Sequence, residues 1–153
     1  MGSPEYGIIG DTMPGPRVVV DTNVVVAGLR SRKGVAFRLL AEIGKGRFEI
    51  ALSVPLVLEY EDALLRPQAG KLGQADVDAV LDYFCKVAHL QQIFFLWRPL
   101  LNDPRDDMLL ELAVAARCQS IVTYNVRDFA GAEMFGISVL EPRPFLSAIG
   151  VLK

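Results

Sequence analysis

Histidine and cysteine are scarce in this chain, which has one histidine, His89, and two cysteines, Cys85 and Cys118, among 153 residues. A structural zinc cage needs about four such side chains, so a zinc site is excluded. The cysteines have neither the CxxC spacing of redox and metal motifs nor a secretory context, and we expect them to be buried thiols. Metal chemistry in this protein must therefore use oxygen-bearing side chains.

A surplus of charge of one sign is also missing. The 16 basic and 18 acidic residues leave a formal net charge of −2. Proteins that bind nucleic acid mainly by neutralising phosphates usually carry a basic surplus, so any contact with nucleic acid must come from a local site. No glycine pattern of a dinucleotide-binding or P-loop motif is present, which excludes the common nucleotide-binding classes.

Long apolar runs are absent as well, and none approaches the ~20 residues that a membrane span needs. Residues Met1 to Pro16 contain glycines and prolines but not the ordered regions of a signal peptide. We therefore expect a flexible leader over 1–16, a single domain over 17–153, and a cytoplasmic protein. The 52% of hydrophobic residues also predicts an apolar face that a second copy covers, as in a homodimer.

Hydrophobic periodicity predicts strands that alternate with helices along the chain. This alternation predicts a three-layer α/β/α fold with a mainly parallel central sheet of about five strands. In such sheets, sites form beyond the carboxyl ends of the strands, where Asp21 and Asn125 both fall. The expected strands cover 17–20, 48–52, 93–97, 120–123 and 136–140; the expected helices cover 33–45, 53–65, 74–88, a stretch from 103 and the tail after 142.

Acidic residues follow or flank several of these elements. Asp21 comes directly after the first buried strand, where a carboxylate is costly to desolvate unless a cation or hydrogen bonds compensate it. The alternative is that Asp21 only caps a turn. Glu59 lies in the helix that begins near Ser53, but Glu61 and Asp62 are beside it. A solvated run of charge is therefore the alternative interpretation of all three residues.

The segment that begins Asp103-Pro104 separates its acids more clearly. Pro104 suits the first helical position, so Asp103 is the expected N-cap and Asp106 the third-position acid that supports it. Asp107 has no such duty and is the better candidate ligand. Asn125 and Asp128 follow the fourth long strand, where turn hydrogen bonds alone would also explain them. Acids from separate segments, without histidines, suit Mg²⁺ or Mn²⁺.

Four segments taken in order resemble the motifs of the PIN-domain family, and their order and spacing match over about residues 17–148. The resemblance implies a Mg²⁺- or Mn²⁺-dependent endoribonuclease with metal-binding carboxylates at Asp21, Glu59 and Asp107. It departs from the commoner family pattern at Asn125, which carries no charge, so a second metal ion would bind weakly unless Asp128 compensates. The four segments are Val18–Val24, Pro55–Tyr60, Asp103–Ala113 and Ile121–Phe129.

Further polar and basic residues surround these motifs. They fall into two groups, one that would support the acidic site and one that would guide the RNA backbone. For any single basic residue, solubility and salt bridges are the alternative explanation. The supporting candidates are Thr22, Asn23, Ser53 and Thr123, and the RNA-binding candidates are Arg30, Arg32, Lys33, Arg66, Arg105 and Arg127.

Small proteins that resemble this one are often toxins of toxin–antitoxin pairs, which implies an RNA substrate, a cognate antitoxin protein and a homodimer. A second hypothesis is a non-catalytic RNA- or protein-binding PIN module with a weakened metal site. A third is phosphoryl transfer with Asp21 as nucleophile, but Asn23 stands where such enzymes usually place a second Asp. A metal-free ribonuclease would commonly need two histidines, and this chain has one.

Overall fold

The computed structural model describes residues 15–93, 101 and 103–153. Within these residues, one sheet of five strands has the order β3-β2-β1-β4-β5, and every neighbouring pair is parallel. This confirms the predicted α/β class with a parallel sheet. The strands are β1 (Arg17–Val20), β2 (Glu49–Leu52), β3 (His89–Leu90), β4 (Ser120–Val122) and β5 (Ser138–Leu140).

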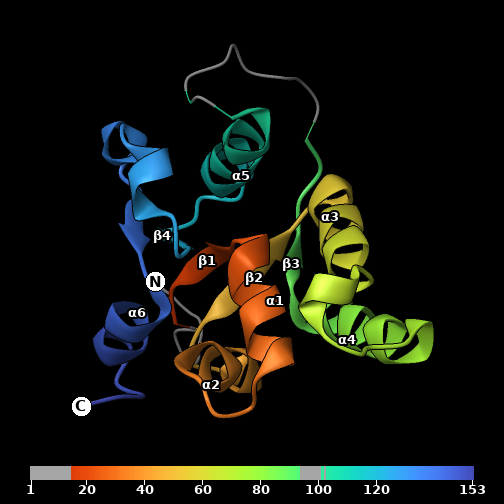
Figure 1. Cartoon of the computed structure of the whole chain (residues 1–153). Helices are drawn as coiled ribbons and strands as arrows, with labels where there is room; N and C mark the ends of the chain where they lie inside the picture. Colours follow the sequence, from red (N-terminus) through yellow and green to blue (C-terminus); the bar gives the residue numbers. More distant parts are fainter. Residues whose placement is uncertain (1–14, 94–100, 102) are drawn as a thin grey trace.

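Helices connect the strands and cover the sheet (Figure 1). Helix α5 packs against β1, β2 and β4, whereas α1 packs against α2 and α3, and α3 packs against α4. None of the helices in the described part of the chain is long and apolar enough to cross a membrane. The helices are α1 (Thr22–Arg30), α2 (Val35–Glu42), α3 (Val54–Leu64), α4 (Gln74–Val87), α5 (Pro104–Ala115) and α6 (Pro142–Ala148).

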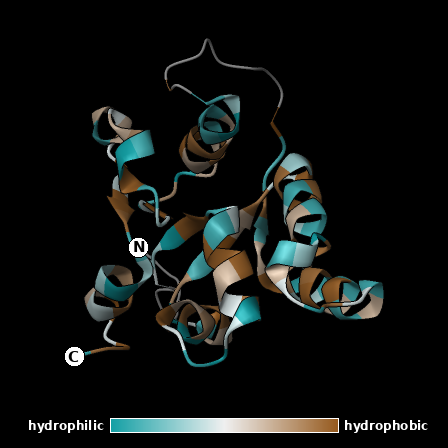
Figure 2. Ribbon diagram, in the orientation of Figure 1, coloured by the Kyte–Doolittle hydropathy of each residue, from teal (hydrophilic) through white to brown (hydrophobic). Residues whose placement is uncertain are grey.

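The core lies along the central strands, where Figure 2 shows hydrophobic residues concentrated. Val18, Val19 and Val20 are almost fully buried, as is Ile121 beside them on β4. A strand that is buried on both faces reads as a continuous β-branched run, and this is why β1 was readable from the sequence. Burial of each such side chain contributes about 1.5–3 kcal/mol to folding. Both free cysteines are at least partly buried, Cys118 more than Cys85.

Helix α1 was not predicted; it lies between the strand expected over 17–20 and the helix expected over 33–45. Its three successive valines, Val24 to Val26, are weak helix formers, but Val24 and Val25 are buried and packing outweighs propensity. Gly28 permits close contact with α2, because a Cβ built there would lie 2.5 Å from Leu40 Cδ1. The following helix is shorter than the 33–45 expected and covers Val35–Glu42.

The third strand also differs from the prediction of 93–97. The structure places β3 at His89–Leu90, paired with β2, directly after the helix that was expected over 74–88. Two residues are too few to produce a hydrophobic period. Ile93 lies in no strand, and residues 94–97 are outside the described residues.

The expected leader, 1–16, is outside the described residues up to position 14. The last leader residue, Pro16, already belongs to the fold, because its carbonyl accepts a hydrogen bond of 2.9 Å from the backbone N–H of Glu49.

Tyr60 joins α3 to the central strand: its buried hydroxyl donates a hydrogen bond to the backbone carbonyl of Val20. We expect Tyr60→Phe to lower the free energy of unfolding by about 1–2 kcal/mol, because a buried carbonyl loses its donor. Urea denaturation measures this loss. Tyr83→Phe is the matched control. The Tyr83 hydroxyl donates a hydrogen bond to the Ile43 carbonyl, but Tyr83 is 44% exposed, so water can replace the lost donor. Equal losses in the two variants would contradict this account of Tyr60.

Candidate active site

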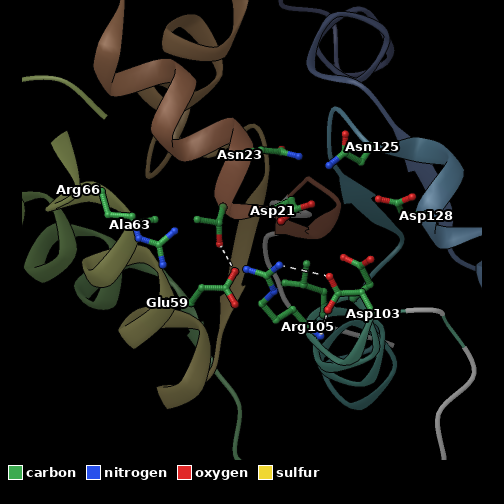
Figure 3. A pocket seen from close by; sticks show the side chains of 12 residues that line it. Asp21, Asn23, Glu59, Ala63, Arg66, Asp103, Arg105, Asn125 and Asp128 are labelled. Atoms are coloured by element: carbon green, nitrogen blue, oxygen red, sulfur yellow. Dashed lines mark hydrogen bonds and ion pairs between the residues drawn. The ribbon is translucent and has the colours of Figure 1, made fainter. Parts of the chain in front are cut away.

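A pocket of about 190 Å³ opens beyond the carboxyl end of β1, between α3, α5 and the segment that follows β4. Figure 3 shows acidic side chains from these separate elements facing one another across it. This is where the parallel sheet was expected to form a site. The pocket is lined by Asp21, Thr22, Asn23, Glu59, Ala63, Arg66, Asp103, Arg105, Asp106, Leu109, Asn125 and Asp128.

Asp21 lies at the floor of this pocket and is buried, with 8% of its surface exposed. It occupies the N-cap position of α1 but makes no capping hydrogen bond with its side chain. Its Oδ2 instead accepts a hydrogen bond of 2.8 Å from the Thr123 hydroxyl. Burial raises the pKa of Asp21, the Thr123 bond lowers it, and the charges of Glu59 and Asp128 raise it further. The carboxylate is therefore costly to keep ionised without a cation.

Thr123 organises the polar groups behind Asp21. It is fully buried, and its Oγ1 accepts hydrogen bonds from the Asn125 backbone N–H at 2.9 Å and from Asn23 Nδ2 at 3.4 Å. The Asn23 Oδ1 in turn accepts from the backbone N–H of Tyr124 at 3.3 Å. These bonds tie the start of α1 to the end of β4, and they fix the direction of the Asp21 carboxylate.

Glu59 reaches the pocket from α3. Its Oε2 accepts a hydrogen bond from the Thr22 hydroxyl, so the first residue of α1 orients it. The next residue, Tyr60, anchors the same turn of α3 to β1. The predicted supporting residue Ser53 does not line the pocket; its Oγ caps α3 by accepting from the Leu56 N–H at 3.3 Å.

The N-terminus of α5 supplies a different acid from the one expected. Asp103 is the N-cap as predicted, and it accepts from the Arg105 N–H at 2.9 Å. Asp106 lines the pocket, whereas Asp107 does not and instead accepts a hydrogen bond of 3.0 Å from the Leu101 N–H. The expected convergence of Asp107 with Asp21 and Glu59 is therefore not found, and Asp106 takes that place.

The sequence did contain a signal for Asp106. Successive helical residues point about 100° apart, so residues three, four and seven apart share a face. Asp106 precedes the buried Leu109, Leu110 and Ala113 at these intervals, and that row packs against the sheet. A carboxylate one turn before the row stands above the carboxyl edge of the strands. Assigning Asp106 a capping role concealed this.

The acids in the pocket perturb one another. Burial, together with the charges of Asp103, Asp21 and Asp128, raises the pKa of Asp106 to about 6. Asp128 and Asn125 are exposed and form the rim on the β4 side. Such a concentration of negative charge on oxygen ligands suits a hard divalent cation.

Carboxylates alone do not make a finished metal site. Among the residues that the structure describes, no three His, Cys, Asp or Glu side chains are close enough to hold an ion in their present positions. The donor set nevertheless fits Mg²⁺ or Mn²⁺ in kind, since it consists of oxygens from Asp21, Glu59, Asp106, Asn125 and Asp128. Binding would require small side-chain movements, which the partly exposed Glu59 and Asp106 allow.

Of the predicted RNA-binding residues, Arg66 and Arg105 line the pocket. The others lie elsewhere. Arg30 ends α1, with its Nη1 donating to the Gln68 carbonyl at 3.4 Å. Arg32 and Lys33 are exposed in the turn that follows, and Arg127 lines a separate hollow next to β5.

A family model described as PIN domain matches residues 17–127. The chain belongs to the PIN-domain family. Among solved structures, a chain of VapBC2 from Rickettsia felis, bound to a DNA fragment from its promoter, has the same fold. It is 16% identical, with a TM-score of 0.52 over 82% of this chain and 97% of that one. No curated protein matches this PIN domain.

The clustered acids of this PIN domain make its stability depend on pH. The pKa of Asp106 is raised from 3.8 to about 6, so the folded protein favours its protonated form. The stability that this preference contributes is fully present below about pH 4 and is lost as the pH rises through about 6. In metal-free protein, Asp106→Asn should therefore raise the melting temperature by a few degrees at pH 7.5 and by less at pH 4.5. Thermal unfolding in EDTA measures both. A melting temperature of the variant below that of the wild type at pH 7.5 would show that the pocket does not destabilise the ionised Asp106 carboxylate.

Proposed function

We propose that this PIN domain is a Mg²⁺- or Mn²⁺-dependent endoribonuclease in which Asp21, Glu59 and Asp106 hold the catalytic ion. The observation that carries the proposal is the convergence of these three acids, from the end of β1, from α3 and from α5, on one pocket. Asn125 and Asp128 complete the oxygen-rich rim. Asp106 replaces Asp107 in the ligand set because Asp107 bonds to the backbone outside the pocket.

In the proposed hydrolysis of the phosphodiester bond, each residue of the site has a separate role. A bound divalent ion supplies a water of lowered pKa and offsets charge on the phosphate oxygens. Asp21 is held in place by Thr123 and contributes a fixed negative charge at the floor of the pocket. Glu59 is oriented by Thr22, and Arg66 and Arg105 offer guanidinium groups to the RNA backbone. The family resemblance implies products with a 5′-phosphate and a 3′-hydroxyl.

The uncharged Asn125 supports dependence on one tightly held ion. Each carboxylate that is missing from a site for a dication lowers the attraction, and a second ion loses more than a first. Asp128 lies on the same rim and supplies a charge nearby. Asn125, which stands where many family members carry Asp, is also the feature that favours the second candidate function, a non-catalytic RNA- or protein-binding module.

We further propose that the protein is the toxin of a toxin–antitoxin pair, acting on cytoplasmic RNA as a homodimer with a cognate antitoxin. The fold shared with VapBC2 supports this role. A mostly apolar hollow of about 270 Å³ beside β3 supports the proposed protein contacts. Val54, Leu58 and Leu90 border it and are 73%, 58% and 61% exposed. This surface would remain available while the acidic pocket is open to RNA.

The test is cleavage of single-stranded RNA by purified protein during a Mn²⁺ titration, with calorimetry of Mn²⁺ binding in parallel. We expect Asp21→Asn to reduce cleavage at least about 100-fold, because the buried charge nearest the centre of the site is lost. Asp106→Asn and Asp107→Asn form a matched pair of neighbours. The first should lose about 100-fold in rate and weaken Mn²⁺ binding, whereas the second should lose less than about tenfold.

Two results would contradict the proposal in different ways. Loss of Mn²⁺ binding in Asp107→Asn but not in Asp106→Asn would show that Asp107, and not Asp106, is the third ligand. If wild-type protein neither binds Mn²⁺ nor cleaves RNA, the non-catalytic module is the correct function.

A further inference from the structure

Two cations, Arg105 and Arg66, line the acidic pocket. Arg105, near the start of α5, forms an ion pair in which its Nη2 is 3.3 Å from Asp103 Oδ2. Figure 3 shows its guanidinium between Asp103 and Glu59, that is, between acids of two different helices. Its charge is attracted to Asp103, Glu59 and Asp106, which together raise the pKa of Arg105. Arg105 thus partly neutralises the carboxylates that would hold a metal ion.

The second arginine of the pocket is placed differently. Arg66 follows the end of α3 and forms an ion pair with Asp62, a residue of that helix. Asp62 is exposed and does not line the pocket, so Arg66 makes its ion pair with an acid outside the proposed ligand set. Arg105, in contrast, forms its ion pair with an acid that lines the pocket.

The side chain of Arg105 is also open to solvent. It is 69% exposed, and its partner Asp103 is 41% exposed. Exposed ion pairs of this kind add little to the stability of a fold, since solvent screens them and holding two long side chains in place costs entropy. A guanidinium that leaves Asp103 keeps its charge and its planar fork of donors, and this geometry matches a phosphate.

We propose that Arg105 is an internal counter-ion of Glu59 and Asp106. It competes with the divalent ion for the negative charge of these two carboxylates, and it contacts the RNA phosphate when the ion binds. This inference rests on the proposed function of the same pocket. Two cations so close together repel each other, so Arg105 lowers the metal affinity below what the carboxylates alone would give. Its displaced guanidinium then contributes to substrate binding.

Calorimetry with Mn²⁺ alone, at low ionic strength, tests the first half of this proposal. Arg105→Ala should tighten Mn²⁺ binding roughly three- to tenfold, because the competing charge is removed. Arg105→Lys keeps the charge and should stay within about twofold of the wild type. Arg38→Ala is the control for net charge, since Arg38 is exposed on α2 and does not line the pocket, and it should also stay within about twofold.

Steady-state RNA cleavage at saturating Mn²⁺ tests the second half, and Arg105→Ala should raise KM about tenfold. Unchanged or weaker Mn²⁺ binding in Arg105→Ala would overturn the counter-ion role and leave the metal-dependent nuclease intact. Equal tightening in Arg38→Ala would also overturn it, because the effect would then be one of net charge. Absence of Mn²⁺ binding by the wild type would overturn both the inference and the proposed function.

Discussion

The buried carboxylate of Asp21 is the constraint around which the site is arranged. It stands at the end of the central strand β1, where apolar neighbours exclude water and an unpaired charge is expensive. Only Thr123 donates a side-chain hydrogen bond to it among the described contacts. That bond joins β1 to the end of β4, so the position of the charge is set by the pairing of two core strands. A cation in the pocket would relieve the remaining cost.

The other acids are brought to Asp21 by secondary structure. Parallel strands place their carboxyl ends at one edge of the sheet, and α3 and α5 each approach that edge. Tyr60 fixes α3, and thereby Glu59, to β1, while buried leucines of α5 fix the direction of Asp106. Carboxylates held this close repel one another, so a cation between them is stabilised, and Arg105 supplies part of this positive charge. On the proposed function, the metal affinity would depend both on the packing of the core, which positions the acids, and on the charge of Arg105.

Much of this arrangement was predictable, because it depends on patterns that are local in the sequence. The buried strand before Asp21, the cap at Asp103 and the parallel sheet all follow from apolar runs and helix-start signals. Helix α1 was missed since packing, not propensity, makes its valines helical. Asp107 was preferred to Asp106 because Asp106 had been given a capping role, although its spacing to Leu109, Leu110 and Ala113 puts it on the buried face of the helix. The placement of Arg105 depends on side-chain contacts that no spacing reveals.

The most direct test of the central claim is to locate the ion. Crystals of the protein soaked in Mn²⁺ should show an anomalous scattering peak in the pocket, with oxygens of Asp21, Glu59 and Asp106 within about 2.5 Å of it. The Asp107 carboxylate should lie outside this distance. A peak coordinated by Asp107 in place of Asp106, or a pocket without a peak at saturating Mn²⁺, would contradict the account.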